Sequence, residues 1–392
     1  MPYSSLFPSF VCNVLPYSLF HVPLRHSILS VSSMVIDYCD IDRADRFHQQ
    51  YITSLQKIEN AIQYMCIDGG TTLSIFLLAC IDVARMEFRW SRRHLQGLYH
   101  LLRLLQRKNI QRDIGQCLLD QIWQIAIRLD WAISLYTVEP PVFPMHRHPQ
   151  NWRPPKSISW ALDGDTAGRA LAAFAQDYLM HQACSLAAKV RKIRKSPNYT
   201  TGLEPGILHA AKLLERGNQE WRHCHIVQID RHWDRGNECS QGPLPDASPI
   251  SANSVSFLDH AGRPAHNTFY ANLEMASYVI SIYISFIVHP VIGRPREHPQ
   301  FTDAAEICRT LAGLGQNGLD TVVSQVWIMF LAGVVFGEVR RAEQEAKWLR
   351  QRMSLAVEKY PLKHVLSACE QLWDAEGDFW DEMEKMKNTI YQ

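Results

Sequence analysis

Histidine and cysteine side chains, the usual protein ligands of zinc, gather in one short segment of the chain. They are His223, Cys224, His225, His232 and Cys239. Structural zinc sites pair their ligands at tight, repeated spacings, and three adjacent residues on a helix point in different directions. The segment therefore favours a histidine-rich helix end, where cations suit the helix dipole, beside a free thiol. We predict no metal site here.

Two other groups of side chains have suitable chemistry but unsuitable surroundings. Asp40, Asp42 and Asp45 could hold magnesium and a diphosphate if they faced a cavity together with a second acidic cluster. Arginines interleave with them in DIDRADR, and no second cluster is present, so a solvated linker is expected. His146 and His148 could exchange protons, but no nucleophile or phosphate-binding motif accompanies them. The sequence predicts no catalytic residue and no cofactor.

Two charged segments each allow two interpretations. The basic run KVRKIRK at 189–195 has the composition of a nuclear-import or nucleic-acid patch, and also that of the solvated C-terminal end of a helix, which we favour. The acidic tail at 374–392 mixes tryptophan and phenylalanine with carboxylates, as activation segments do. An amphipathic terminal helix docked on the core has the same composition, and the sequence leaves these two alternatives for the tail open.

The composition is that of a globular protein, with 47% hydrophobic and 20% charged residues in a chain of 392. A formal net charge of +1 provides no global basic field for nucleic acid. Ten cysteines are scattered without a C-x-x-C, which indicates free thiols in a reducing compartment. Prolines interrupt the apolar N-terminus and argue against a secretory signal, and no apolar stretch reaches the roughly 20 residues that span a bilayer.

Apolar side chains recur at three- and four-residue spacings along most of the chain, and alternating strand patterns are nearly absent. The sequence therefore predicts an all-α fold, a large multi-helix bundle or array, as a single domain over residues 1–392. Proline-rich segments at about 139–163 and 235–267 are predicted to be long loops. We expect a short helix over LRHSILSVSSMVI, a helix capped by Thr71 or Thr72, and a helix capped by Ser91.

Two stretches of the chain have a distinctive order of features. In the first, ACIDVARMEFRWSRRHLQGLYHLLR precedes a long helix with an internal RLDW and then a proline-containing loop. In the second, Val326–Trp373, Trp327 opens an apolar helix and the small-residue patch AGVVFG follows. Arginine-rich turns then end in WLRQRM, and after a break at Pro361 a helix ends in Leu-Trp. Together they resemble the fungal-specific transcription factor domain, the helical regulatory region of zinc-cluster transcription factors.

The resemblance covers most of the chain and implies a regulatory region of a nuclear protein whose DNA is read elsewhere. The family's DNA reader, a binuclear zinc cluster of six cysteines, has no counterpart in this sequence. No DNA-binding residue is carried over, so the chain is expected either to be a regulatory-domain-only relative or to lack an upstream exon. The expected partners are the transcription machinery or a zinc-cluster protein, with a homo- or heterodimer allowed and no membrane or direct DNA contact.

The expected function is transcription regulation in the nucleus, of a metabolic or secondary-metabolite gene cluster. The first alternative is a biosynthetic-pathway enzyme built on the same helical scaffold, with its site near the 139–163 loop and its histidines. The second alternative is a cytoplasmic scaffold protein.

Overall fold

A computed structural model describes most of the chain. The chain folds as two compact units: an N-terminal unit, Tyr3–Leu171 with Ile390–Gln392, and a C-terminal unit, Ala172–Thr389 with Met1–Pro2. That they act as one regulatory domain stays a prediction. The described residues are 7–37, 44–64, 67–85, 87–108, 116–145, 164–195, 205–237, 268–289, 291–292, 301–313, 322–338, 346–351, 353–354, 367, 370–371, 373 and 377–390.

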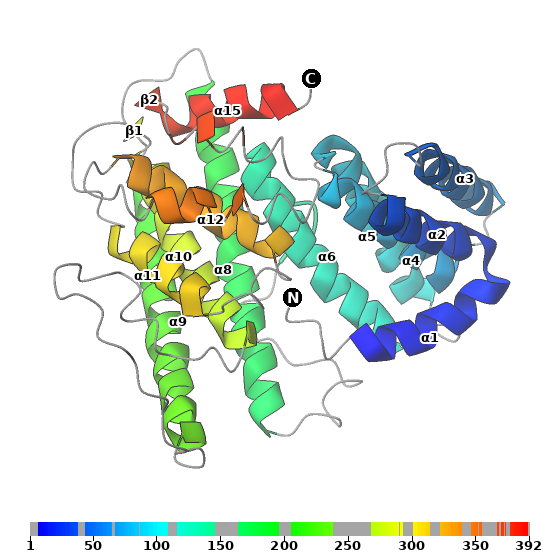
Figure 1. Ribbon diagram of the computed structural model, residues 1–392, viewed down its shortest axis with the longest axis horizontal. Helices are drawn as coiled ribbons and strands as arrows, with labels where there is room; N and C mark the ends of the chain where they lie inside the picture. The colour runs from blue at the N-terminus through cyan, green and yellow to red at the C-terminus, as the bar shows by residue number, and fades with distance from the viewer. Residues whose placement is uncertain are drawn as a thin grey trace. The chain divides into compact units, whose positions relative to one another are not determined.

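The N-terminal unit is a set of helices built around a central, apolar one. Its elements are α1 (Phe7–Phe20), α2 (Val22–Asp37), α3 (Ala44–Gln63), α4 (Gly69–Ala84), α5 (Phe88–Lys108) and α6 (Gln116–Thr137). Twelve of the sixteen residues of α4 are buried, so most of its surface must be covered by neighbours. Helices α2, α3, α5 and α6 supply that cover, and α2 also packs along α3 (Figure 1).

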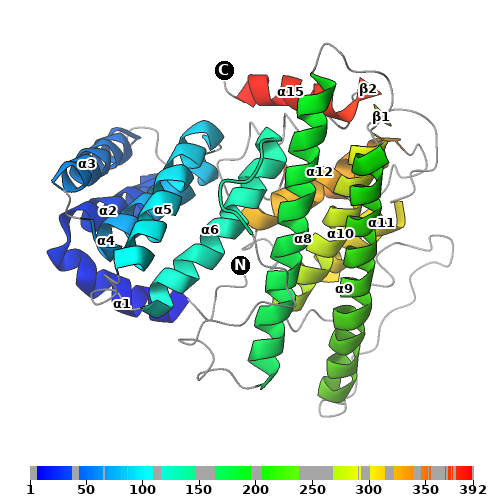
Figure 2. The same ribbon diagram turned by 180° about the vertical axis from the view of Figure 1, so that it is seen from behind.

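The C-terminal unit surrounds a second buried helix, α10. Its elements are α8 (Gly164–Arg194), α9 (Pro205–Asn237), α10 (Thr268–Val288), α11 (Phe301–Gly313), α12 (Val322–Glu338), α15 (Phe379–Ile390), β1 (Val291–Ile292) and β2 (Gly377–Asp378). Met275, Ile280, Tyr283 and Phe286 of α10 are almost fully buried. Helices α9, α11 and α12 contact α10, and the long helices α8 and α9 stand out in Figure 2.

The all-α prediction is confirmed, since the described strands are two residues long and form one antiparallel pair. Residues 139–145 are irregular, as predicted, and the rest of both predicted loops lies outside the described residues, except for 235–237 at the end of α9. No described helix combines the length and the apolar character needed to cross a bilayer. Cys80, Cys184, Cys224 and Cys308 are free thiols.

Two features of the N-terminal unit differ from the predictions. Helix α5 begins at Phe88 rather than after Ser91, and the buried Ser91 Oγ donates to Ala79 O of α4 at 3.0 Å. The hydroxyl joins two helices instead of capping one. Helix α1, which was not predicted, continues through Pro16.

Asp68 begins α4 and ties it to the start of the chain. Its Oδ1 accepts from Thr71 N and Thr71 Oγ1, both at 2.8 Å, and lies 3.1 Å from His21 Nε2. Tyr17 OH donates to Oδ2 at 3.3 Å. The prediction that Thr71 or Thr72 caps this helix is wrong, because Asp68 occupies the cap and Thr71 donates to it.

The Asp68 cap leads to a prediction for stability. Burial raises the pKa of Asp68, but the hydrogen bonds from His21 and Thr71 outweigh burial and hold that pKa at about 2. The unfolded value is about 3.9, so the stabilisation is present above roughly pH 4 and is lost as the pH falls toward 2. We expect Asp68→Ala to lower the free energy of unfolding by about 2 kcal/mol at neutral pH, measured in urea. The exposed Glu59→Ala is the control, and an equal loss in both variants would contradict this role.

Candidate functional site

His223, Cys224, His225 and His232 lie in the second half of α9, which ends at Asn237. His223 and Cys224 are exposed, and burial lowers the pKa of the half-buried His225. The side chains of His232 and Cys239 lie outside the described residues. Within the described part of the chain, no group of histidine, cysteine and carboxylate side chains is arranged to hold a metal ion.

The remaining candidate groups cannot be placed. Asp40, Asp42, His146 and His148 lie outside the described residues, as does the side chain of Asp45. Asp45 belongs to the first turn of α3, so the prediction of a linker is wrong at this residue. A solvated linker over Asp40 and Asp42, a basic loop and a chain without catalytic residues stay predictions.

The basic run and the acidic tail pair with each other inside the C-terminal unit. Arg194 and Asp378 form a two-pronged ion pair, with Nη1 donating to Oδ1 at 2.8 Å. Arg191 and Lys195 both contact Glu384, with Lys195 Nζ 3.6 Å from Oε1. These bonds join the last turn of α8 to α15 and the residue before it (Figure 2). The run ends a helix, as predicted, but Arg191 and Arg194 are paired and largely buried rather than solvated.

Aromatic side chains dock the tail on α10. The Phe379 ring stacks on Phe286 with centroids 4.2 Å apart, and the Trp380 ring meets Tyr283 edge-on at 5.6 Å. Trp380 Nε1 donates to Phe286 O at 3.2 Å. That carbonyl belongs to the last turn of α10, where no intrahelical partner remains. Of the two interpretations of the tail, the docked helix is the one that the structure shows.

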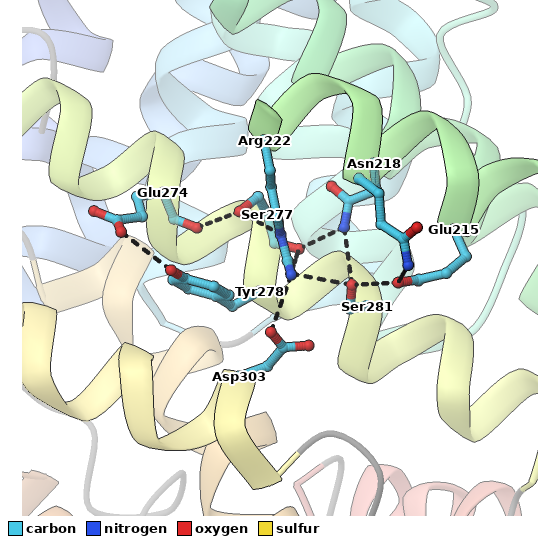
Figure 3. Close-up of polar contacts among 9 residues, drawn as sticks. Glu215, Asn218, Arg222, Glu274, Ser277, Tyr278, Ser281 and Asp303 are labelled. Atoms are coloured by element: carbon cyan, nitrogen blue, oxygen red, sulfur yellow. Dashed lines mark hydrogen bonds and ion pairs between the residues drawn. The ribbon is translucent and has the colours of Figure 1, made fainter. Parts of the chain in front are cut away.

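A buried polar network connects α9, α10 and α11, and Figure 3 shows its side chains converging on one guanidinium. Arg222 Nη1 donates to Asp303 Oδ1 at 3.0 Å, and Nε donates to Ser277 Oγ at 3.2 Å. Its Nη2 donates to Ser277 O at 2.8 Å and to Ser281 Oγ at 3.0 Å. The Arg222 Cζ also lies 4.5 Å from the centroid of the Tyr278 ring. Three helices are thus held by one side chain.

The amide of Asn218 and the hydroxyl of Ser281 extend this network. Asn218 Nδ2 donates to Ser277 O at 2.8 Å and to Ser281 Oγ at 2.9 Å. Ser281 Oγ donates in turn to Glu215 Oε1 at 3.0 Å. With one donated and two accepted bonds, including the bond from Arg222, the hydroxyl uses its full capacity. In this part of the structure, Glu215 Oε2 and Asn218 Oδ1 are buried without a hydrogen-bond partner among the described residues.

The charged groups of the network are paired with one another, as expected for a network that holds helices together. Burial raises the pKa of the Asp303 carboxyl, and the Arg222 guanidinium opposes that rise. Burial, followed by the charge of Glu274, raises the pKa of Tyr278, whose OH donates to Glu274 Oε1 at 3.1 Å. The guanidinium is engaged by four acceptors and a ring, all of them internal to this unit. The network therefore positions helices.

Removing the cation should expose this role. Arg222→Met leaves Asp303 buried without its partner, and we expect the free energy of unfolding to fall by about 3 kcal/mol. Arg216→Met on the same helix is the matched control, because Arg216 and its partner Glu220 are both largely exposed. Urea titrations that give the two variants the same loss would contradict the role of the network in holding helices together.

A second titratable cluster lies between α3, α4 and α5 in the N-terminal unit. Tyr51 OH donates to Asp82 Oδ1 at 2.8 Å, and His94 Nε2 lies 3.3 Å from both Asp82 Oδ2 and Tyr51 OH. The His94–Asp82 pair is within ion-pair distance, yet among the described residues Asp82 Oδ2 has no hydrogen-bond donor. Burial raises the pKa of Asp82 to about 7 and lowers the pKa of His94 to about 4. Both side chains are therefore uncharged near pH 5.5.

The Asp82 shift predicts a loss of stability as the pH rises from about 4 to 7. Its folded pKa lies above the unfolded one, so the stabilisation is complete below about pH 4 and is lost as the pH rises through 7. Asp82→Asn should keep the bond from Tyr51 and remove the charge. Between pH 5 and 8 we expect the unfolding free energy of this variant to gain about 2 kcal/mol relative to the wild type.

The control for this variant is Glu59→Gln at an exposed site of the same unit, whose offset from the wild type should not change with pH. An Asp82→Asn offset that is constant from pH 5 to 8 in urea titrations would show that the carboxyl does not titrate in this range. His94 acts in the opposite direction, since its lowered pKa removes stability as the pH falls from about 6.5 to 4.

Residues of the first distinctive stretch fasten the end of α6. Arg92 Nε lies 2.9 Å from Glu139 Oε2, and Nη2 donates to Pro140 O. Asp130 Oδ2 accepts from Phe143 N at 2.7 Å, and the Phe143 side chain is fully buried. Burial raises the pKa of Asp130 to about 6, against the backbone bonds from Phe143 and its neighbour. The arginine and aspartate of this stretch hold the start of the proline-rich segment.

Three parts of the Val326–Trp373 stretch meet at one indole ring. Trp373 Nε1 donates to Phe330 O of α12 at 3.0 Å, and the ring is buried. It lies so close to Gly333 that any Cβ there would overlap it. Arg350 Cζ lies 5.8 Å from the ring centroid. The small-residue patch, the arginine-rich turn and the Leu-Trp ending therefore form one packing unit.

The sequence carries signals for these sites that the predictions above did not include. Glu215, Asn218 and Arg222 are spaced by three and four residues and so share a face of α9. Ser277 and Ser281 form a polar stripe on the otherwise apolar α10. A polar stripe inside an apolar helix indicates hydrogen-bond partners on a neighbour.

Comparisons of the chain with protein-family models, with curated proteins and with solved structures find no match. What is shown is an all-helical architecture, and any family assignment is a proposal.

Proposed function

We propose that this chain is the helical regulatory region of a fungal-type transcription regulator, and that it acts by binding other proteins rather than by catalysis. The observation that carries the proposal is the meeting of Gly333, Arg350 and Trp373. These residues carry the resemblance to the fungal-specific transcription factor domain, and they are far apart in sequence. Their contact in space supports the proposal, because the features that carry the resemblance also form one packing unit of the fold.

The first distinctive stretch supports the same proposal. Its Ser91, Arg92 and His94 all make contacts that join helices or hold a loop. Such internal contacts stabilise the fold, so they support the resemblance in fold. The function depends on the partners that the fold binds, which are proposed separately. The proposed partners are components of the transcription machinery or a zinc-cluster protein, which would supply the DNA contact.

The proposed context is the nucleus and the control of a metabolic or secondary-metabolite gene cluster. Loss of the gene should change the transcript levels of such a cluster, and the tagged chain should be nuclear. Complementation with Gly333→Ala should fail, because the added methyl group meets the Trp373 ring and costs about 3 kcal/mol of unfolding free energy. Transcript profiling and fluorescence microscopy are the measurements.

Gly206→Ala is the matched control, since a Cβ at Gly206 meets no atom within 4 Å. This variant should restore the transcript pattern. A tagged chain excluded from the nucleus, together with unchanged transcripts in the deletion strain, would refute the proposal. Turnover of a pathway metabolite by the purified chain, lost in His146→Ala or His148→Ala, would replace it with the enzyme alternative.

A further inference from the structure

Helix α5 has an exposed basic face. Its 21 residues include six arginine or lysine side chains and no carboxylate. Arg89, Arg93, His100 and Arg103 are exposed at spacings of three, four and seven residues, so they follow one side of the helix. Among the described residues, no ion pair involves Arg89, Arg93 or Arg103. The whole chain has a net charge of only +1, so this positive charge is local.

A second column of α5 runs beside the basic one and has a different chemistry. Trp90, Gly97 and Leu104 are spaced by seven residues, two turns apart, which places them along one edge of the exposed face. The Trp90 side chain is 49% exposed, and Leu104 is half-buried. A Cβ at Gly97 would meet nothing within 4 Å, so the column has an open notch at its centre. Small residues at such positions let a second helix approach closely.

We propose that this face of α5 docks an acidic amphipathic helix of a partner protein. The apolar side of that helix would lie over Leu104 and over the part of the Trp90 ring that the Arg93 guanidinium, 4.8 Å from its centroid, leaves open, and would cross α5 at Gly97. Its carboxylates would pair with Arg89, Arg93 and Arg103. The proposal names a partner class and does not depend on a role in transcription.

The chain already contains an ion-pairing arrangement of this kind. In the C-terminal unit, Glu384 of the acidic helix α15 pairs with Arg191 and Lys195 at the basic end of α8, while Phe379 and Trp380 are buried beneath. Carboxylates over a basic helix, combined with an aromatic anchor, give a stable contact in this protein. Helix α5 offers the basic half of that arrangement, and its exposed arginines meet no acidic half within the part of the chain that the structure describes.

Other occupants fit the face less well. A second copy of this chain would set arginine against arginine, which costs free energy. A nucleic-acid backbone would use the arginines but gain nothing from the notch, and a net charge of +1 gives little long-range attraction. A membrane surface needs a wide apolar face, whereas this column offers only the side chains of Trp90 and Leu104.

The proposal is tested on the purified full chain with a designed probe. The probe is a fluorescein-labelled helical peptide of about 20 residues, the length of α5, with leucine on one face and glutamate on the other. Fluorescence anisotropy should show saturable binding that weakens with salt. A peptide with lysine in place of glutamate should not bind.

The triple variant Arg89→Glu, Arg93→Glu, Arg103→Glu should weaken binding at least about tenfold, because it removes three exposed ion pairs. The matched control, Arg25→Glu, Arg46→Glu, Lys57→Glu, changes three exposed cations elsewhere in the same unit and should bind as the wild type does. Gly97→Leu keeps every charge and fills the notch, so it should also weaken binding. Circular dichroism and urea midpoints confirm that each variant is folded.

Three outcomes would overturn the proposal. The first is equal binding by the wild type and the triple variant. The second is equal binding of the peptide by Gly97→Leu and the wild type, which would show that no helix packs against α5 at Gly97. The third is tighter binding of a DNA duplex of about 20 base pairs, lost in the same triple variant, which would make the face a nucleic-acid contact.

Discussion

A polar side chain inside a helical core needs a hydrogen-bond partner, and some hydroxyls, such as that of Ser74, find it on their own helix. Where the partner lies on a neighbouring helix, the bond helps to fix which helices meet, and both units contain such bonds. Apolar packing alone is tolerant, because many arrangements bury similar areas. A buried guanidinium is not tolerant, since a misplaced neighbour leaves its donors unpaired. The donors of Arg222 are all paired only when α10 places Ser277 and Ser281 beside the guanidinium and α11 places Asp303 beside it. Direction and register of three helices follow from that requirement.

The N-terminal unit meets the same constraint with smaller groups. Ser91 needs the Ala79 carbonyl, Asp82 needs the Tyr51 hydroxyl, and Asp130 needs the Phe143 amide. The first bond joins α5 to α4, the second joins α3 to α4, and the third joins α6 to the segment that follows it. These bonds therefore help to specify which elements pack together. The two carboxyl groups also have raised pKa values, because the burial that makes these bonds specific also disfavours the charged form. Specificity and titration behaviour have the same origin.

Helix positions could be predicted from the sequence because the spacing of apolar side chains is a local property. The all-α class follows from it, as does the helix expected over LRHSILSVSSMVI, which lies within α2. The role of Ser91 was less predictable, since it depends on which helix lies opposite. The Asp68 cap is a local bond from Thr71, and the preference of aspartate for N-cap positions could have indicated it. The pairing of Arg194 with Asp378 was beyond local patterns, because the two residues are 184 positions apart. Composition identified the basic run and the acidic tail separately, but it could not show that they pair with each other.

The docking of α15 on α10 has a consequence for synthesis of the chain. Trp380, which covers the end of α10, lies 94 positions after Phe286, whose carbonyl it binds. At a translation rate of roughly 5–20 residues per second, Trp380 is synthesised on the order of 5–20 s after Phe286. The N-terminal unit has nearly all of its residues before position 172 and is free to form its core in the meantime. Co-translational folding of this protein therefore proceeds in steps. Between them, chaperones can bind the aromatic surface of α10 that α15 has not yet covered.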